Sequence, residues 1–362
     1  MTRTALPFAL LAWLITALPS AASAQPPTGA TLPAGVSVDA SSLALLTQPG
    51  TFDDLHELGI SHLRLPIEEY PVDRLDAHRR TAEVRDALMR IAREARGRSI
   101  SLIGVIGPHT IPRSTARPNH LSDPRTRAHI VHVTVDAARL YDLHAIEVWP
   151  HVFTSALHDS MGDYARLVIE LREGLDAQAP EVKIILPWVP EGFDPAFESI
   201  MLDHRRNSHD RLPFEAVIIH ASGDAPFHWS DLRQEVDLWI ADLGAQPSLP
   251  ICLLHSISTP CTMLGPYRQA SELISIARQF HDSVSPPHLY LYAHYLDPEP
   301  RESQDPSEAP STGLRHNSLS FYHRKPIWYT FSDVAHAREP SIDLLQIHGT
   351  RRPLAIDSEG AP

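Results

Sequence analysis

Histidines stand at chemically useful places in this sequence, because several of them end or follow short apolar runs. Four such residues are His109, His151, His220 and His255, and His294 lies within a further run. An imidazole can donate or accept a proton near neutral pH and is also a common ligand of zinc. If the runs are strands whose ends meet, these side chains would converge as acid–base groups or as ligands of a transition metal. The chain contains neither H-x-H nor H-E-x-x-H, so the usual motifs of zinc hydrolases are absent.

Carboxylates near the same run ends could supply the negative charge that many hydrolases use. Glu147 lies inside an apolar run and has the same alternation parity as His151, while Glu191 and Asp297 each follow a run. Glu147 has a second interpretation, as a buried acid that pairs with Arg64 or with a histidine. Glu191 and Asp297 also fit ordinary solvated loop acids. The sequence therefore offers catalytic carboxylates without deciding among them.

Aromatic side chains also gather at or just past the run ends. They are Trp149, Trp188, Trp229, Tyr292 and Tyr295. Sugar sites use aromatic faces together with a few planar polar groups, so this set is compatible with a carbohydrate ligand. Each residue taken singly also fits packing in the core or at its rim.

Eight short apolar runs predict β-strands that would position these residues. The runs are Gly35–Asp39, Ser61–Ile67, Ile100–Gly107, Ala145–His151, Val182–Trp188, Phe214–His220, Pro250–Ser256 and Leu289–Tyr295. Segments with an apolar face of helical period lie between them, for example at residues 84–95, 164–175, 232–243 and 273–280.

Helix-end signals agree with this phase. Ser122-Asp123-Pro124 and Ser230-Asp231 are typical of helix starts, and Gly244 is typical of a helix end. A last helix is predicted at Trp328–Ala337. Alternating strands and helices at this spacing predict an α/β fold of one domain, a closed (β/α)₈ barrel (TIM barrel), over residues 34–340. An open doubly wound sheet is the alternative, but no G-x-G-x-x-G and no G-x-x-x-x-G-K-[ST] supports a nucleotide-binding version.

Four segments, in order, resemble strands of the clan of retaining glycoside hydrolases built on (β/α)₈ barrels. Residues 59–66, GISHLRLP, resemble the second strand, with a Gly before a strand that ends near Arg64. Residues 146–151, IEVWPH, resemble the fourth, which usually reads Glu-x-Trp-Asn-Glu. Residues 214–220, FEAVIIH, are similar to the sixth, and residues 250–255, PICLLH, to the seventh. The resemblance implies an active site at the carboxyl ends of the strands.

The departures from that clan concern the catalytic pair. The resemblance places His151 where the clan has its acid/base glutamate and His255 where it has its nucleophile, and Pro150 replaces the usual asparagine. Retaining hydrolysis needs two carboxyl groups about 5 Å apart, one to protonate the leaving group and one to attack. Histidine is a poor substitute for the attacking carboxylate, so we expect the standard mechanism to be lost.

The resemblance and its departures together predict a glycoside-hydrolase-like barrel that binds a glycan without standard hydrolysis, a pseudoenzyme with no cofactor. Its expected binding residues are Arg64, His109, Trp149, Trp188, His220, Trp229 and Tyr292, beside His151, His255 and Glu147 at the catalytic positions. One alternative is an active glycosidase that uses His151 as acid with Glu147, Glu191 or Asp297. Another is a metal-dependent hydrolase with histidine ligands. Schiff-base chemistry is disfavoured, because Lys183 lies at the wrong end of its predicted strand.

Composition bounds the setting in which this barrel works. The chain has 362 residues, 31 Lys+Arg against 44 Asp+Glu and a net charge of -13, which disfavours a nucleic-acid partner. Residues 1–24 have the basic, apolar and A-x-A pattern of an export signal, so the mature protein is expected to be secreted or periplasmic, without a membrane anchor. Residues 25–33 form a lead and 341–362 a tail. Export would permit a Cys252–Cys261 disulfide, and two unpaired cysteines are the alternative.

Overall fold

The protein is described here by a computed structural model, which covers residues 32–38, 43–67, 75–106, 121–148, 161–189, 193–222, 228–244, 249–256, 265–283, 285–293 and 326–336. The predicted export signal, lead and tail lie almost wholly outside these ranges. So do several predicted site residues, namely His109, Trp149, His151, Glu191, His294, Tyr295 and Asp297. Within the described residues, no helix is both long enough and apolar enough to cross a membrane.

Eight parallel strands close into a barrel in sequence order, which confirms the predicted fold class. The strands are β1 (Ala34–Ser37), β2 (His62–Pro66), β3 (Ser101–Ile106), β4 (Ala145–Val148), β5 (Lys183–Pro187), β6 (Ala216–Ser222), β7 (Ile251–Ser256) and β8 (Leu289–Tyr292). Strand β1 pairs with both β2 and β8, so the sheet has no free edge.

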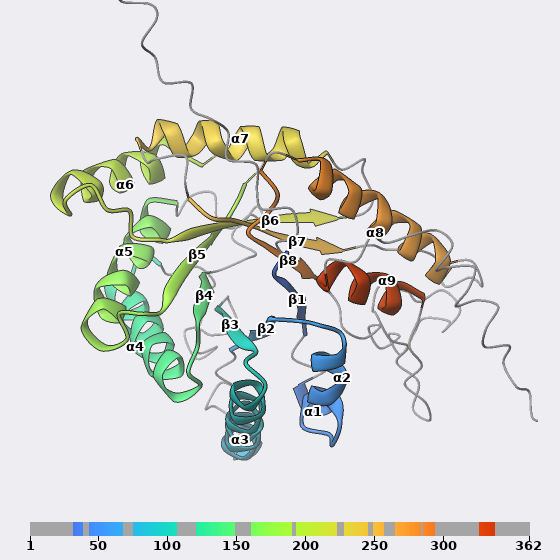
Figure 1. Ribbon diagram of the computed structural model, residues 1–362. Helices are drawn as coiled ribbons and strands as arrows, with labels where there is room; N and C mark the ends of the chain where they lie inside the picture. Colours follow the sequence, from blue (N-terminus) through green and yellow to red (C-terminus); the bar gives the residue numbers. More distant parts are fainter. Residues whose placement is uncertain are drawn as a thin grey trace, which may run out of the picture. The chain divides into compact units, whose positions relative to one another are not determined.

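The helices lie around the strands, as Figure 1 shows. Their bounds are α1 (Leu43–Leu46), α2 (Thr51–Glu57), α3 (Leu75–Gly97), α4 (Pro124–Leu140), α5 (Met161–Gln178), α6 (Pro195–Asn207), α7 (Trp229–Asp242), α8 (Gly265–Asp282) and α9 (Pro326–Ala335). A parallel pair needs a crossover between its strands, and these helices provide it while covering the outer face of the barrel.

Helix ends follow the predicted signals at some places and depart from them at others. Asp123 caps α4, accepting a hydrogen bond from the Arg125 backbone N–H at 2.9 Å. Gly244 follows α7 with φ of 67°, a conformation in which glycine is unstrained. The predicted start of α7 at Ser230 is wrong, because the helix begins at Trp229 with His228 as its N-cap. Helix α9 begins at Pro326, two residues before the prediction, as proline suits a first helical position.

Alternating residues of strands β3 to β8 belong to two separate buried clusters. One cluster contains only strand residues, such as Ile218, Cys252, Leu254 and Leu291, and fills the barrel interior. The other joins the intervening strand residues, such as Leu253, to the buried faces of the helices. Because successive side chains of a strand point to opposite faces, a residue's parity decides whether it faces the interior or the helix layer.

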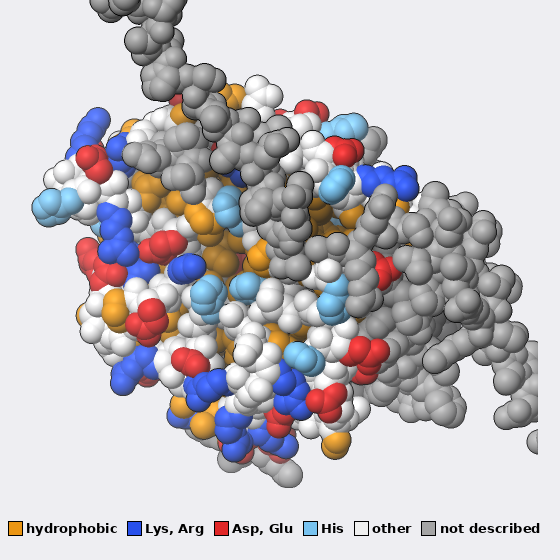
Figure 2. Space-filling view, viewed as in Figure 1, with side chains coloured by type: hydrophobic (Ala, Val, Ile, Leu, Met, Phe, Trp, Pro, Cys, Tyr) orange, Lys and Arg blue, Asp and Glu red, His pale blue; other side chains and the backbone are white. Residues whose placement is uncertain are grey.

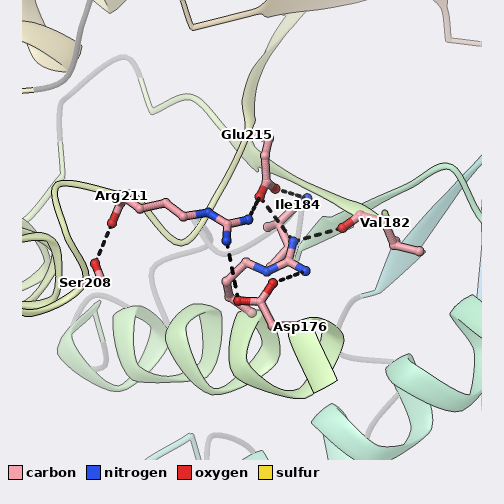
Figure 3. A network of polar contacts seen from close by, with 7 residues as sticks. Asp176, Val182, Ile184, Ser208, Arg211 and Glu215 are labelled. Atoms are coloured by element: carbon pink, nitrogen blue, oxygen red, sulfur yellow. Dashed lines mark hydrogen bonds and ion pairs between the residues drawn. The ribbon is translucent and has the colours of Figure 1, made fainter. Parts of the chain in front are cut away.

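Arg172 of helix α5 is buried and forms hydrogen bonds at the amino ends of β5 and β6. Figure 3 shows the surrounding network, with Val182, Ile184 and Glu215 labelled. Arg172, only 3% exposed, donates to the Val182 carbonyl at 2.9 Å and to Glu215 Oε1 at 3.2 Å, and its Nη2 lies 2.8 Å from Asp176 Oδ1. The other oxygen of Glu215 accepts the Ile184 backbone N–H at 2.8 Å. This network ties α5, β5 and the segment before β6 together and involves no residue of the predicted site.

Candidate functional site

Polar side chains from four strands meet inside the barrel, toward its carboxyl end. Arg64 donates from Nε to Glu147 Oε2 at 2.6 Å and from Nη2 to Glu147 Oε1 at 2.9 Å. His220 Nε2 donates to the same Oε1 at 2.9 Å, and Arg64 Nη1 donates to Ser37 Oγ at 2.9 Å. The structure therefore brings together three residues that the sequence singled out, and it confirms that Glu147 pairs with both Arg64 and a histidine.

Local sequence explains why these groups share one place. Arg64, Glu147 and His220 each have interior parity, alternating with outward-facing apolar neighbours such as Leu63 and Ile146. Each lies in the carboxyl half of its strand. Ser37, the last residue of β1, pairs in register with Arg64 across the β1–β2 ladder. The closed barrel thus places the four side chains around one point.

The electrostatics of Glu147 follow from its surroundings. Its side chain is 0% exposed. Burial alone would raise the pKa of this carboxyl, but the charge of Arg64, together with His220 and their hydrogen bonds, outweighs burial and holds the pKa well below its usual range. Glu147 is consequently a permanent anion whose two oxygens are both engaged.

That state limits what Glu147 can do chemically. A general acid must carry a proton at working pH, and a nucleophile needs access to the anomeric carbon. Glu147 has neither property, because it is ionised, buried and hydrogen-bonded on both oxygens. What it does is hold Arg64 and His220 in fixed orientations.

Exposure increases from Glu147 toward the two cationic partners. The Arg64 side chain is 12% exposed and that of His220 is 30% exposed. Among the described residues, the bonds of Arg64 use three of the five N–H groups of its guanidinium. The Nε2 side of the His220 ring bonds to Glu147, and the opposite edge of the ring is the part left for a ligand. A sugar hydroxyl can accept from the Arg64 guanidinium and can donate to the second ring nitrogen of neutral His220.

A side chain of the helix layer forms a hydrogen bond with Val148, the last residue of β4. Tyr164 on α5 is fully buried and donates its hydroxyl to the Val148 carbonyl at 3.1 Å. Burial, followed by the charge of Glu147, raises the pKa of this phenol well above its usual value, so it remains a neutral donor. Tyr164 therefore fixes the strand end from which the chain continues to Trp149 and His151.

His255 lies elsewhere than the family resemblance led us to expect. It alternates with the interior residues Cys252 and Leu254, so its ring faces the helix layer. The ring is 2% exposed and tilted against that of Tyr290 at 6.4 Å between centroids. Burial lowers its pKa to about 4. We expected the His255 side chain to lie beside the interior site. It lies on the other side of the strand, because its parity is opposite to that of the interior residues.

Three aromatic residues of the predicted site also pack away from the interior. Trp188 lies against Phe193 and Trp239 in the outer cluster, and Tyr292 lies against Phe331 of α9. Trp229, 1% exposed, donates its indole N–H to the Ser285 carbonyl at 2.8 Å.

All three rings are almost fully enclosed by protein. Their predicted stacking on a ligand is therefore corrected to core packing, since a sugar ring needs an accessible aromatic face.

Ser37 is a site residue that sequence reasoning missed. It is buried, 4% exposed, and its hydroxyl accepts from Arg64. The available signal was its parity with Gly35 in a strand whose other residues are apolar, because a buried hydroxyl needs a partner.

Metal ligation has no support in the part of the chain that the structure covers. No three His, Cys, Asp or Glu side chains of these residues are grouped so as to hold a metal ion. His109, His151 and His294 lie outside the described residues. Cys252 is a free, buried cysteine of the barrel interior, and burial raises its pKa to about 12. Cys261 also lies outside the described ranges.

Comparison with known proteins shows similarity of structure without detectable similarity of sequence. The sequence matches no protein-family model and no curated protein. An endo-1,4-beta-xylanase of Penicillium canescens is similar in structure, with a TM-score of 0.56 at 13% identity over 85% of this chain and 95% of that one.

Two further structures show the same similarity. A glucosidase from Croceicoccus marinus gives a TM-score of 0.57 at 13% identity, covering 84% of this chain and 67% of that one. A mutant xylanase A of P. fluorescens subsp. cellulosa, in complex with xylopentaose, gives 0.55 at 15% identity over 85% and 99% of the two chains. The chain therefore shares its (β/α)₈ fold with these glycoside hydrolases.

Proposed function

We propose that this protein is a carbohydrate-binding (β/α)₈ barrel that holds its ligand at the carboxyl end of the barrel and lacks standard retaining hydrolysis. Arg64 and His220 are the described groups that contact the sugar. Glu147 positions both residues by hydrogen bonds, and Ser37 adds a hydrogen bond to Arg64.

The observation that carries this proposal is the bonding of Glu147. Both of its oxygens are engaged by Arg64 and His220, and its side chain is 0% exposed. Removing such a carboxylate from water is costly, so its retention needs a reason, and the positioning of Arg64 and His220 toward a ligand supplies one. In this barrel class, ligand sites lie at the carboxyl ends of the strands, which is where Arg64 and His220 lie.

The structural neighbours support the ligand class. One of them was determined in complex with xylopentaose and another is a glucosidase. On this basis the ligand is an oligosaccharide or a sugar-containing partner, and a linear xylo-oligosaccharide is the first compound to test. Trp149 and His109 remain the predicted aromatic and polar contacts, and both await a test.

The expected loss of hydrolysis rests on His151 and His255 standing at the two catalytic positions, and on the lack of a usable carboxyl pair among the described interior residues. In the described interior, Glu147 is the carboxylate that faces the site, and it is committed to Arg64. His151 would take the acid/base position of the family, where an imidazole can donate a proton but cannot supply the second carboxylate. Export to the periplasm or medium, proposed from residues 1–24, would give the protein access to plant or microbial glycans.

A two-part assay on the full chain tests the proposal. Calorimetric titration with a panel of xylo-, cello- and glucan oligosaccharides should reveal saturable binding. Release of reducing sugar from the matching polysaccharides should stay at the level of a buffer blank. Sugar release that is lost on His151→Ala would overturn the binding-only function and identify an active glycosidase. Failure of the whole panel to bind would remove the carbohydrate ligand itself.

A further inference from the structure

A second polar cluster lies at the opposite, amino end of the barrel. His62 is the first residue of β2, Lys183 is the first residue of β5, and His144 immediately precedes β4. The rings of His62 and His144 meet edge to face with 5.7 Å between their centroids. Lys183 pairs in register with Ala145, and its backbone N–H donates to the His144 carbonyl at 3.2 Å, so its charge lies near both imidazoles. None of the three residues contributes to the cluster around Glu147.

The cluster is open to solvent on one side and apolar on the other. Lys183 and His144 are exposed and His62 is half-buried. Behind them lie interior residues such as Ala145 and Cys252, and the charge of Lys183 is felt at the Cys252 thiol. Figure 2 shows histidines beside a basic side chain and recessed hydrophobic side chains near the centre of the view.

Hydrogen bonding fixes which nitrogen of His62 is available. The Ser61 hydroxyl donates its proton to the Ala34 carbonyl at 3.1 Å, so it accepts from Nδ1 of His62 at 2.8 Å. The neutral His62 ring therefore carries its proton on Nδ1. Its Nε2 has a free lone pair and becomes a second donor once the ring is protonated.

Positive charge at this end has no described counter-ion. No ion pair joins Lys183 to a carboxylate among residues that the structure covers. Of the nearby described acids, Glu215 pairs with Arg172 and Asp142 with Arg96, while Glu181 is exposed and forms no ion pair with Lys183. The groups that act on His62 are His144 and Lys183, and burial together with these two lowers its pKa to about 4. The pKa of His144 is lowered by burial and by Lys183.

We propose that His62, His144 and Lys183 form a binding site for a small oxyanion at the amino end of the barrel. Lys183 offers up to three N–H donors, and each imidazole offers one more when protonated. A phosphate, sulfate or carboxylate supplies the missing negative charge and accepts from all three side chains. The site is separate from the carboxyl-end site and does not depend on a carbohydrate ligand.

Anion binding at this place must take up protons. The free site keeps both imidazoles uncharged near neutral pH, and a bound anion favours their charged forms. Affinity therefore rises as pH falls, by about tenfold per pH unit for each proton taken up. For an anion that does not itself titrate in this range, such as sulfate, a site made only of Lys183 would show no such dependence between about pH 7.5 and 5.5.

The test is a titration of the full chain with inorganic phosphate, followed through histidine NMR signals and by calorimetry. We expect saturable binding, with the signals of His62 and His144 shifting together. The pH dependence is read from sulfate, whose charge is constant in this range, and sulfate should bind about tenfold tighter or more near pH 5.5 than near pH 7.5. Parallel titrations with sulfate and acetate distinguish a tetrahedral oxyanion from a carboxylate.

Three variants make the result decisive. Lys183→Gln and His144→Gln change exposed residues and should each weaken phosphate binding at least about tenfold while leaving the unfolding temperature nearly unchanged. His132→Gln, on the outer face of α4, is the matched control and should bind as the parent does. Absence of saturable binding, or equal binding by Lys183→Gln and the parent protein, would overturn the proposal. Binding of oligosaccharides should be unaffected in all three variants.

Discussion

The guanidinium of Arg64 donates two hydrogen bonds, of 2.6 and 2.9 Å, to the buried carboxylate of Glu147 across the barrel interior. This pair joins β2 to β4, and His220 extends it to β6. A bidentate pair fixes the plane of the guanidinium as well as its position. The relationship explains why an ionised acid lies at the centre of the candidate site without being available for proton transfer.

Removing the charge of Glu147 should destabilise the whole domain. In Glu147→Gln the amide replaces an oxygen acceptor by a donor facing Arg64 or His220, and a mostly buried guanidinium loses its counter-ion. We expect a loss of about 3–5 kcal/mol in the free energy of unfolding, measured by urea denaturation. Asp203→Asn removes an exposed acid that pairs with Arg206 on α6 and should change stability by less than about 0.5 kcal/mol. Equal stability of Glu147→Gln and the parent would show that the pair is not formed.

Stability should decline on mild acidification because of buried histidines. Burial is the main cause that lowers the pKa of His255 and of His62 to about 4 in the folded protein. The unfolded chain binds these protons near pH 6.5, so the stability is full above that pH and is lost as pH falls toward 4. Each histidine contributes a slope of about 1.4 kcal/mol per pH unit in this window.

The contribution of one histidine can be isolated by substitution. Urea unfolding at several pH values in phosphate-free buffer should give a shallower slope between pH 6.5 and 4 for His255→Gln than for the parent. His132→Gln, whose ring is exposed on α4, should retain the parent slope. An unchanged slope in His255→Gln would mean that this ring is not buried against Tyr290.

The network around Arg172 should matter for folding and not for ligand binding. Arg172→Leu leaves the Val182 carbonyl and Glu215 without their buried donor, and we expect it to cost about 2 kcal/mol or more. Chemical denaturation measures this loss. The dissociation constant for an oligosaccharide should stay within about twofold of the parent value at a temperature where the variant is folded. A variant that binds far more weakly would connect this end of the barrel to the ligand site.

Substitution of Trp229 should not change the affinity for the ligand, although the sequence suggested that this residue stacks on a sugar. Its ring is buried against Phe280 of α8, with 5.8 Å between ring centroids, and its N–H is satisfied by Ser285. Trp229→Phe should therefore lower the melting temperature and leave calorimetric affinity for oligosaccharides unchanged. A large loss of affinity in a folded Trp229→Phe protein would show that the ring reaches the ligand.

Much of the fold was predictable because strands and helices have different hydrophobic periods. The run Ser61–Ile67 contains β2, and the run Pro250–Ser256 contains β7. The apolar face predicted for residues 164–175 is the buried face of α5. Glycine after α7 and aspartate before α4 marked their helix ends by local hydrogen bonding.

The site was predictable only in strands where a polar residue among apolar ones shows which alternate side chains face the interior. Arg64, Glu147 and His220 are polar residues in apolar strands, and pairing among them satisfies their buried groups. In β7 and β8 both faces are apolar, so nothing in the sequence shows which alternate set faces the interior. That ambiguity is why His255 and Tyr292 were assigned to the wrong side of the barrel wall.

The proposed carbohydrate-binding surface consists of Arg64 and His220 held by Glu147, and the variant His220→Gln removes one of its two ligand contacts. His220 is the most exposed of the three, so its replacement should leave the fold intact. Calorimetry with the tightest-binding oligosaccharide should show affinity reduced at least about tenfold, as expected for loss of a hydrogen bond to a fixed ring nitrogen, with His132→Gln equal to the parent. Equal affinity in folded His220→Gln and parent protein would contradict the account.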